Sequence, residues 1–496
     1  MKTNTIYGGI YKKDPSINTK QFIMNPEMLN IENRFVVYYL WETIAHNLMI
    51  AKVGIIKRST AKKILTELIK ILKEVKIKNI INPILGDVHE NIENKLTQTI
   101  GPEAGWFHVA RSRNDQSITD QKLFTKKQII ETCKNLIDLE RTLLFKSNLY
   151  FEVLMPGYTH MQPAMPSTYG FWLQAYLDQI IKIHLSLISV FNSIDFCPLG
   201  AGASYGVNWK INPKFTSALL GFSNPMENSL SAVNSRGIDD AMVISQLTTL
   251  SIVFSRMMED IMIWSLPQLD FIKVDEALTT GSSIMPQKMN LDIVEKIRSK
   301  SSLLIANLNH VLIALKGTSS GYNRDSAESK IAIVKSLEEI ITTIFMTKEV
   351  IKNILPNTNK MKSDTTLTLS TKFADNLSKK YHIPFRISHK IVGKILAKTN
   401  SDVCLITPLL VNQVINEYIN SKLNINQSFI KNTFDLNQAL DHYNYLGSPN
   451  SNYLLKVNKK LSNKITYLSN WYNKQNTFFK NIEKKLIKEV IKFVNK

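Results

Sequence analysis

A ten-residue segment in the second half of the chain carries side chains that are suited to a reactive loop. The segment Gly281–Asn290 reads GSSIMPQKMN and places Ser282 directly after a glycine, which gives a loop backbone its freedom. A serine hydroxyl acts as a base only when neighbouring donors and a dry site activate it. Lys288 and Asn290 offer an ammonium and an amide donor, which suit the stabilisation of a developing negative charge. Taken alone, the segment also fits a serine-rich turn beside a solvated lysine.

Three further non-helical segments stand between helical patterns. HVARSRNDQ at 108–116 contains Arg113 and Asn114, and an arginine fork pairs with a carboxylate through two parallel hydrogen bonds. MPGYTHMQP at 155–163 contains His160. A carboxylate partner would help this histidine to hold a proton, although a lone histidine is more often structural. PLGAGASYG at 198–206 is rich in glycine. Loops on a rigid scaffold collect functional residues, so these segments are the candidates for a site.

Long helices must position these loops. Between residues 239 and 265 apolar residues recur every three or four positions, which is the pattern of a helix about 40 Å long. They cover so wide an arc that the helix must be buried among others, while its charged residues argue against a membrane span. Similar patterns run over 117–150, 167–194 and 292–316. Because patterns of period two are scarce, the sequence predicts a mainly α fold built on a helical bundle.

The two ends of the chain have different patterns. The first 25 or so residues are polar and irregular, and a helical pattern runs from about 31 to 78. Pro83 and Gly86 close this pattern, and Asp87 is suited to cap the next helix. Beyond residue 352 a polar boundary precedes shorter helices. The last forty or so residues form a basic amphipathic pattern, which favours a surface helix.

The composition argues against several classes of protein. The net charge is +20, but the basic residues are spread along the chain without an aromatic-interleaved stripe, so nucleic-acid binding is not expected. Cys133, Cys197 and Cys404 stand far apart and indicate neither a disulfide framework nor a metal site. No apolar run reaches the ~18 residues of a membrane span, and the first residues lack the apolar stretch of a secretory signal. We therefore expect a cytoplasmic protein that binds neither metal nor membrane.

Several segments resemble the argininosuccinate lyases of the fumarase/aspartase superfamily. GSSIMPQKMN is similar to the superfamily signature GSSxMPxKxN, HVARSRNDQ to the family's HxARSRNDQ, and PGYTHMQ to its PGYTHLQ. Further matches are DVH at 87–89, PMENSLSAV at 225–233, GYNRD at 321–325, IPFRISHKIVG at 383–393 and LGSP at 446–449. They follow in family order over roughly residues 85 to 450, which excludes chance agreement. The chain is therefore identified as a member of this family.

The resemblance implies the elimination of an amine from an N-substituted succinate, with release of fumarate. In this sequence Ser282 resembles the family's base, His160 its acid-side histidine, Glu295 the carboxylate that orients the histidine, and Lys288 a stabiliser of the charged intermediate. The implied substrate-binding positions are Arg113, Asn114, Thr159 and Arg236 around the succinyl portion, Asn290 beside its carboxylate, Gln162 near the histidine, Tyr322 and Lys330 near the amine portion, and Asp87 and His89 along the pocket. No cofactor is implied, because side chains handle the protons and the charge.

The resemblance also implies an architecture. The family forms homotetramers whose central helices make a twenty-helix core, and loops of three subunits build each active site. We expect a three-domain chain with an N-terminal helical domain at 1–110, a central long-helix domain at 111–360, and a small C-terminal helical domain with a basic tail at 361–496.

Some positions depart from the family pattern. Ala327 stands where a glutamine usually contacts the arginine portion, and a lost amide partner changes binding by about 1–3 kcal/mol. Met28 is the nearest counterpart of an N-terminal serine, Leu291 replaces a proline, and Pro163 replaces an arginine. Three hypotheses therefore stay open. The chain is an argininosuccinate lyase, or a related lyase that cleaves or forms another N-substituted aspartate, or a non-catalytic protein like the delta-crystallins. The retained reactive residues argue against the third hypothesis.

Overall fold

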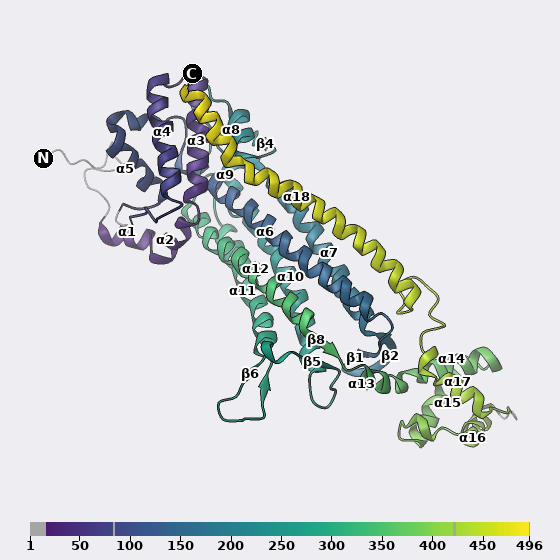
Figure 1. Cartoon of the computed structure of the whole chain (residues 1–496). Coiled ribbons are helices and arrows are strands. Elements are labelled where there is room, and N and C mark those ends of the chain that lie inside the picture. The colour runs from purple at the N-terminus through teal and green to yellow at the C-terminus, as the bar shows by residue number, and fades with distance from the viewer. Residues whose placement is uncertain (1–15, 83–84, 420–422, 496) are drawn as a thin grey trace.

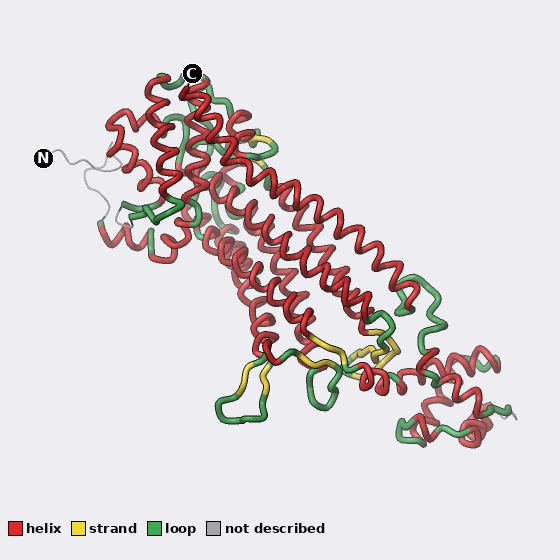
Figure 2. The backbone as a smooth tube through the Cα atoms, viewed as in Figure 1, coloured by secondary structure: helices red, strands yellow, loops and turns green. Residues whose placement is uncertain are grey.

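Long helices lying side by side form the body of the molecule (Figure 1). The computed structural model describes residues 16–82, 85–419 and 423–495. The body contains α6 (Arg113–Leu149), α7 (Tyr169–Ser193), α10 (Ile238–Trp264), α11 (Asp292–Leu315) and α12 (Ser329–Asn353), with α18 (Ser451–Asn495) along one side. Figure 2 shows that helix dominates these parts of the chain. The prediction of a mainly α fold is confirmed, and the four long helices begin and end within a few residues of the predicted limits.

Local signals in the sequence explain where the long helices begin. Ser112 caps α6 through a capping box with Asp115, and the side chain of Thr168 accepts a hydrogen bond from the Phe171 backbone at the start of α7. Gly237 precedes α10 with a φ of 81°, a conformation that favours glycine. These caps satisfy N–H groups that the first helical turn leaves without partners. The polar loops are thereby fixed to the ends of rigid rods.

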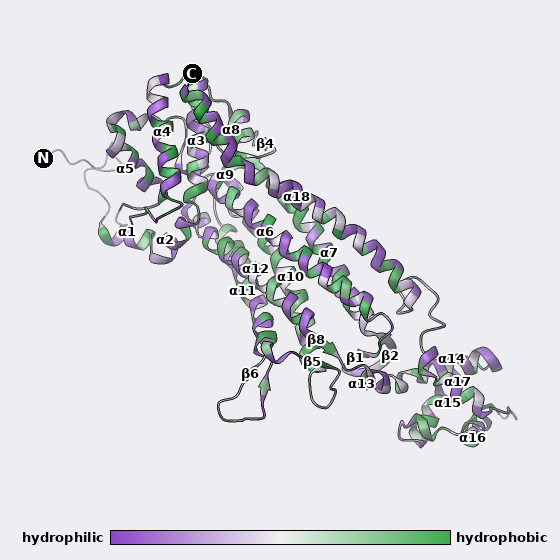
Figure 3. Ribbon diagram, in the orientation of Figure 1, coloured by the Kyte–Doolittle hydropathy of each residue, from purple (hydrophilic) through white to green (hydrophobic). Residues whose placement is uncertain are grey.

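α10 is the central apolar helix of the body. By length and composition it is the one helix in the described residues that could cross a membrane, yet 61% of its most apolar window is buried inside the fold. Its buried residues contact α7, α11 and α12 within a single large hydrophobic core. Figure 3 shows apolar and polar residues recurring along each long helix, as expected of amphipathic helices. Burial among other helices therefore accounts for its composition.

The helices at the N-terminal end partly differ from expectation. The first 25 residues, expected to be irregular, contain α1 (Ile17–Ile23), which Ser16 caps. α2 (Pro26–Asn33) begins directly after this stretch and is capped by Asn25. Polar caps support these short helices where apolar periodicity is weak. They are followed by α3 (Val36–Lys52), α4 (Arg58–Glu74) and α5 (Val88–Ile100). Asp87 caps α5 in a capping box with Glu90, as predicted, while Pro83 lies outside the described residues.

Short helices and strands complete the fold. A small lobe at one end contains α13 (Thr358–Asp364), α14 (Ser370–Tyr381), α15 (Phe385–Lys398), α16 (Pro408–Ile419) and α17 (Gln427–Thr433), and most of it has a separate apolar core. Near the body's other end lie α8 (Pro213–Leu220) and α9 (Ser229–Asn234). The strands pair as β1 (Leu154–Thr159) with β2 (Gln162–Thr168), β3 (Phe196–Cys197) with β4 (Asn224–Pro225), β5 (Ile272–Val274) with β8 (Ile354–Pro356), and β6 (Thr280–Gly281) with β7 (Met289–Asn290).

α18 is the predicted basic amphipathic tail, and it begins at Ser451. Its apolar face, which includes Leu461, Ile465 and Leu468, is buried in the core of the body, where α18 packs against α6 and α7. Its other face lies at the surface. The predicted division of the chain into three domains stays a proposal, and the packing of α18 associates residues 451–495 with the long helices.

Candidate active site

A cleft opens at the N-terminal end of the body, where α2, α5, α6 and α12 meet. It has about 490 Å³ of empty space, including solvent at its mouth. Seven of the ten predicted substrate-binding positions line it: Asp87, His89, Arg113, Asn114, Arg236, Tyr322 and Lys330. Met28 and Ala327, the two departures expected to alter the pocket, line the same cleft. Segments far apart in the sequence are thus brought together around one space.

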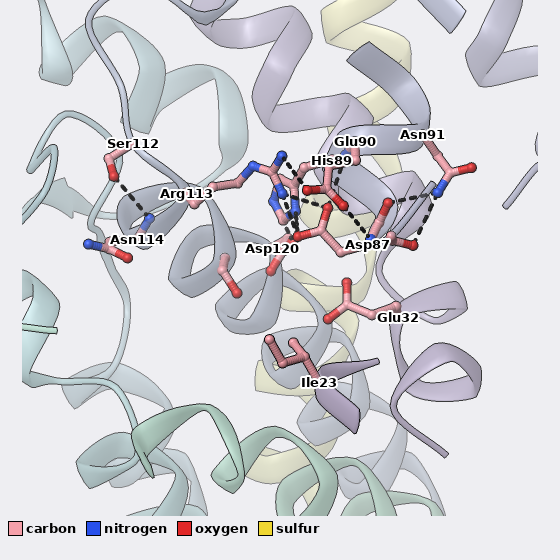
Figure 4. A network of polar contacts seen from close by, with 12 residues as sticks. Ile23, Glu32, Asp87, His89, Glu90, Asn91, Ser112, Arg113, Asn114 and Asp120 are labelled. Atoms are coloured by element: carbon pink, nitrogen blue, oxygen red, sulfur yellow. Dashed lines mark hydrogen bonds and ion pairs between the residues drawn. The ribbon is translucent and has the colours of Figure 1, made fainter. Parts of the chain in front are cut away.

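Asp87 and Arg113 form the first ion pair of the cleft. The Arg113 guanidinium donates to Asp87 Oδ1 at 2.6 Å, and its other nitrogen lies 3.9 Å from Glu90 (Figure 4). Burial alone would raise the pKa of Asp87, but His89 and Arg113 outweigh it and hold that pKa well below its usual range. The pair therefore stays charged at neutral pH, and the helix start at Asp87 fixes the arginine at the wall of the cleft.

A buried carboxylate supports the loop before α6 by accepting backbone hydrogen bonds. Asp115 accepts hydrogen bonds from the backbone N–H groups of Ser112, Gly200 and Gly202, each at 2.9 Å. Burial raises the pKa of Asp115 to about 6, although these hydrogen bonds oppose the shift. The glycine-rich segment at 198–206 therefore acts as a support for the loop that presents Arg113. Ala110, at the bend of this loop, has a φ of 61°, which is uncommon for a residue other than glycine.

A buried lysine forms the second ion pair of the cleft. Lys330 Nζ donates to Glu32 Oε1 at 2.9 Å and to Ser117 Oγ at 3.2 Å. Burial alone would lower the pKa of Lys330, but the carboxylates of Glu32 and Asp120 raise it, so its ammonium stays charged. Arg236 donates to the same serine at 3.4 Å. Ser117 thus links the two cations beneath the cleft.

Sequence reasoning missed Glu32 and Asp120. His89 connects Asp120 to the cleft, since its Nε2 lies 3.7 Å from Asp120 Oδ2 and its Nδ1 lies 3.4 Å from Asp87 Oδ2. Burial lowers the pKa of His89 and raises that of Asp120 to about 8. An acidic residue within a helical pattern is usually solvated, so neither stood out. The one available signal was that Glu32 follows Met28 by one helical turn.

His160 lies at the tip of the β1–β2 hairpin, near the opposite end of the body (Figure 1). Thr159 pairs with Gln162, and the two residues between them, His160 and Met161, have φ values of 52° and 58°. Two central residues with positive φ are the pattern of a type I′ turn, which closes a tight hairpin. The side chains of Thr159, His160 and Gln162 are exposed. The hairpin therefore presents the predicted acid outward.

The loop with the predicted base projects at the same end. Thr280 pairs with Asn290, so the signature segment forms a loop closed by β6 and β7. Ser282 Oγ accepts hydrogen bonds from the backbone N–H groups of Met285 at 3.1 Å and Ile284 at 3.4 Å. Donors aimed at a hydroxyl oxygen stabilise the negative charge that it carries after losing its proton. Lys288 and Glu295 are exposed in the loop and on the first turn of α11.

The two ends of the body are too far apart to act together within one chain. Arg113 begins α6 and the β1–β2 hairpin follows its end, and a helix of 37 residues is about 55 Å long. In the same way α11, with 24 residues, separates Asn290 from Tyr322 by about 36 Å. One copy therefore holds two incomplete parts of the predicted site. Among the described contacts none joins His160 to Glu295, so their proposed pairing stays a prediction.

Known proteins are similar to this chain in sequence and in fold. The family model described as Lyase matches residues 16–305. An argininosuccinate lyase of Sulfurihydrogenibium sp. (strain YO3AOP1) is 35% identical over 80% of this chain and 86% of its own length. One from Listeria monocytogenes serotype 4a (strain HCC23) is 38% identical over 71% and 78%. A crystal structure of EDDS lyase in complex with formate has a TM-score of 0.86 at 22% identity, covers 96% of this chain and 95% of its own, and supports the fold.

Proposed function

The chain belongs to the argininosuccinate lyases, carbon–nitrogen lyases that release fumarate from an N-substituted aspartate, and from this premise we propose that its own substrate is argininosuccinate. The observation that supports this most is the cleft of about 490 Å³, which gathers the residues that match the family's substrate clamps. A dicarboxylate suits it, because four of its lining side chains are arginine or lysine.

The reaction needs a base, a stabilised anion and an acid. The Ser282 alkoxide, formed when the hydroxyl has lost its proton, removes a proton from the carbon next to a carboxylate of the succinyl portion. This step restores the hydroxyl, and the electron pair of the broken carbon–hydrogen bond passes into that carboxylate. Lys288 and Asn290 stabilise the resulting enolate-like dianion. The electron pair then returns to form the double bond of fumarate as the carbon–nitrogen bond breaks. The leaving nitrogen takes its proton from His160, which Glu295 orients.

A complete site requires more than one copy of the chain, and we propose a homotetramer in which three subunits contribute to each site. The separation of the cleft from the two reactive loops supports this arrangement. α10 and α11 also expose apolar side chains along the body, which would be covered between subunits: Ile238, Met242, Ile252, Leu303, Ile305, Leu312 and Ile313. Contiguous exposed apolar patches mark interaction sites. We also keep the predicted cytoplasmic location as part of this proposal.

A second substrate class is favoured by one observation. Met28 and Ala327 both line the cleft. Ala327 stands where the family has a glutamine that contacts the arginine portion, and Met28 is the nearest counterpart of a serine, so one polar partner of the amine portion is missing and the wall of the cleft is altered. A related lyase that acts on another N-substituted aspartate, or adds an amine to fumarate, would tolerate this change. For such an enzyme Ala327→Gln improves the use of argininosuccinate. For an argininosuccinate lyase the wild-type chain is already fast, and the substitution brings no gain.

The deciding experiment is fumarate release from argininosuccinate by the purified chain, followed by ultraviolet absorbance. We expect turnover within the ordinary enzymatic range of ~1–1000 per second. A folded oligomer that releases no fumarate would reject argininosuccinate as the substrate. Fumarate would then be offered with a panel of amines, and an adduct would identify the second class of substrate.

A further inference from the structure

The charges that line the cleft do not all cancel. Asp87 is paired with Arg113, and Glu32 with Lys330. Two lining arginines remain, Arg236 and Arg324, and neither forms an ion pair with a carboxylate within the described part of the chain. A cleft with two unpaired guanidinium groups is suited to a ligand with more than one anionic group.

The two arginines occupy different depths. Arg236 is 8% exposed, and its Nε has no hydrogen-bond partner among the described residues, so it lies at the buried end of the cleft. Arg324 is exposed, and within the same part of the chain it donates one hydrogen bond, from Nη2 to the carbonyl oxygen of Ile23 at 3.4 Å. Tyr322 lies between them along the chain, and the Arg236 guanidinium lies 5.4 Å from its ring centre. The arginines therefore mark an inner and an outer anion position.

The same cleft also has an apolar part. Met24, Met28 and Ala327 line it together with the two arginines, and Met28 and Ala327 are 4% and 5% exposed. Methionine and alanine side chains offer no strong hydrogen-bonding group, but they pack well against methylene groups. An anionic group that reaches the outer arginine is thus best carried on an aliphatic stem.

We propose that Arg324 binds a carboxylate on the amine portion of the substrate, so that the enzyme selects N-substituted succinates whose amine portion is an amino acid. The inference rests on the proposed function and names a specificity residue for the same site. Arg236 faces the succinyl portion in this arrangement, the apolar wall contacts the aliphatic stem, and Arg324 pairs with the distal carboxylate through its two-pronged guanidinium.

The test compares argininosuccinate with its analogue in which hydrogen replaces the carboxylate of the arginine portion. kcat/KM for fumarate release is measured with both compounds for the wild type, Arg324→Gln and Arg324→Lys. We expect Arg324→Gln to lower kcat/KM for argininosuccinate by about 10- to 100-fold, chiefly through KM, as for the loss of a hydrogen bond between charged groups. kcat/KM for the analogue should change by less than about 3-fold. Arg324→Lys should recover part of the loss, because it keeps the charge without the fork.

Lys316→Gln is the matched control. It removes an exposed cation at the end of α11 that does not line the cleft, and both substrates should respond to it equally and weakly. If Arg324→Gln lowers the rates of both compounds by the same factor, Arg324 only supports the Ile23 segment and the inference is overturned. A wild type that uses both compounds equally well also overturns it. Fumarate from neither compound overturns the proposed substrate and the inference with it.

Discussion

The cleft and the reactive loops solve the problem of placing polar side chains in opposite ways. At the cleft, several charged groups are buried and bonded: Lys330 is 2% exposed and bonded to Glu32, and Asp115, behind the loop of Arg113, accepts three backbone N–H groups. At the other end of the body Lys288 and His160 are exposed, and the described hydrogen bonds of the Ser282 side chain lie within its own loop. One chain therefore preorganises the groups that bind substrate, whereas its reacting groups are still exposed to solvent.

This difference has a physical cause. A buried ion pair keeps its geometry because either partner alone would be left as an unpaired charge. An exposed loop that begins with glycine has no such constraint, and its exposed apolar side chains are suited to pack against another surface. Ile284 is 81% and Met289 63% exposed in the loop of Ser282. Binding and reaction are thus expected to fail separately when each end is altered.

The largest effect is expected at the loop end. Ser282→Ala removes the proposed base, so fumarate release should fall by on the order of 10²–10⁴-fold. The fold and the oligomer should stay intact, because the described hydrogen bonds of the side chain lie within its loop. Ser283→Ala, one position along the same exposed loop, is the control and should keep most of the activity. Near-normal turnover by Ser282→Ala would show that another group is the base.

The next largest effect is expected at the cleft end, and it concerns stability. Glu32→Gln leaves the buried ammonium of Lys330 without its bonded carboxylate, so the free energy of unfolding should fall by about 3–5 kcal/mol. Glu27→Gln is a close control, since Glu27 pairs with Lys335 between the same two helices, α2 and α12, with both side chains half exposed. It should change the free energy by less than about 1 kcal/mol.

Denaturation of both variants at one protein concentration measures this difference, because oligomer stability depends on concentration. Equal losses for Glu32→Gln and Glu27→Gln would mean that burial does not distinguish the cleft pair from a surface pair.

A mixing experiment tests whether the two ends belong to one site. Ser282→Ala spoils the loop end, and Arg113→Gln spoils the cleft end. If different subunits supply the two ends, an equal mixture of the two chains should regain about a quarter of the normal activity. Half of the chains carry an intact loop end, the other half carry an intact cleft end, and subunits combine at random. Fumarate release after joint refolding measures it. Activity no higher than that of either variant alone would mean that one subunit supplies both ends of a site.

Much of the fold was predictable, and for a clear reason. The long helices have apolar periods that run for many turns, and Asp87 carries a recognisable capping signal. α1 was missed because none of its seven residues is buried, so its sequence shows no apolar periodicity that would predict a helix. Short helices of this kind depend on caps such as Ser16 more than on a hydrophobic face.

For the site, the family resemblance supplied candidate residues, among them Arg113 and Ser282, and implied that loops of three subunits meet at each site. The lengths of α6 and α11 give the separation of these candidates within one chain. The contacts inside the cleft were not predictable. Glu32 and Asp120 escaped because a buried acid and a solvated acid look the same in a helical pattern. Their importance follows from burial, which tertiary packing decides.

The remaining prediction concerns the pH dependence of stability through Asp120, beneath the cleft. Burial, with Glu32 adding to it and Lys330 opposing it, raises the pKa of Asp120 from 3.8 to about 8. Below pH 4 the carboxyl is protonated in both folded and unfolded chains. As the pH rises towards 8, only the unfolded chain releases the proton, so the stability that this group contributes is lost. The slope is at most about 1.4 kcal/mol per pH unit for one proton.

Asp120→Asn removes this titration, because the amide has no proton to release. The stability of the wild type relative to this variant should therefore decline between pH 5 and pH 8, which unfolding measured at both values checks. A pH-independent difference would mean that Asp120 is already ionised in the folded chain and that Lys330 compensates its charge. Asp120 would then resemble the fully charged Asp87–Arg113 pair at the wall of the cleft, and the buried end of the cleft would be held by ion pairs throughout.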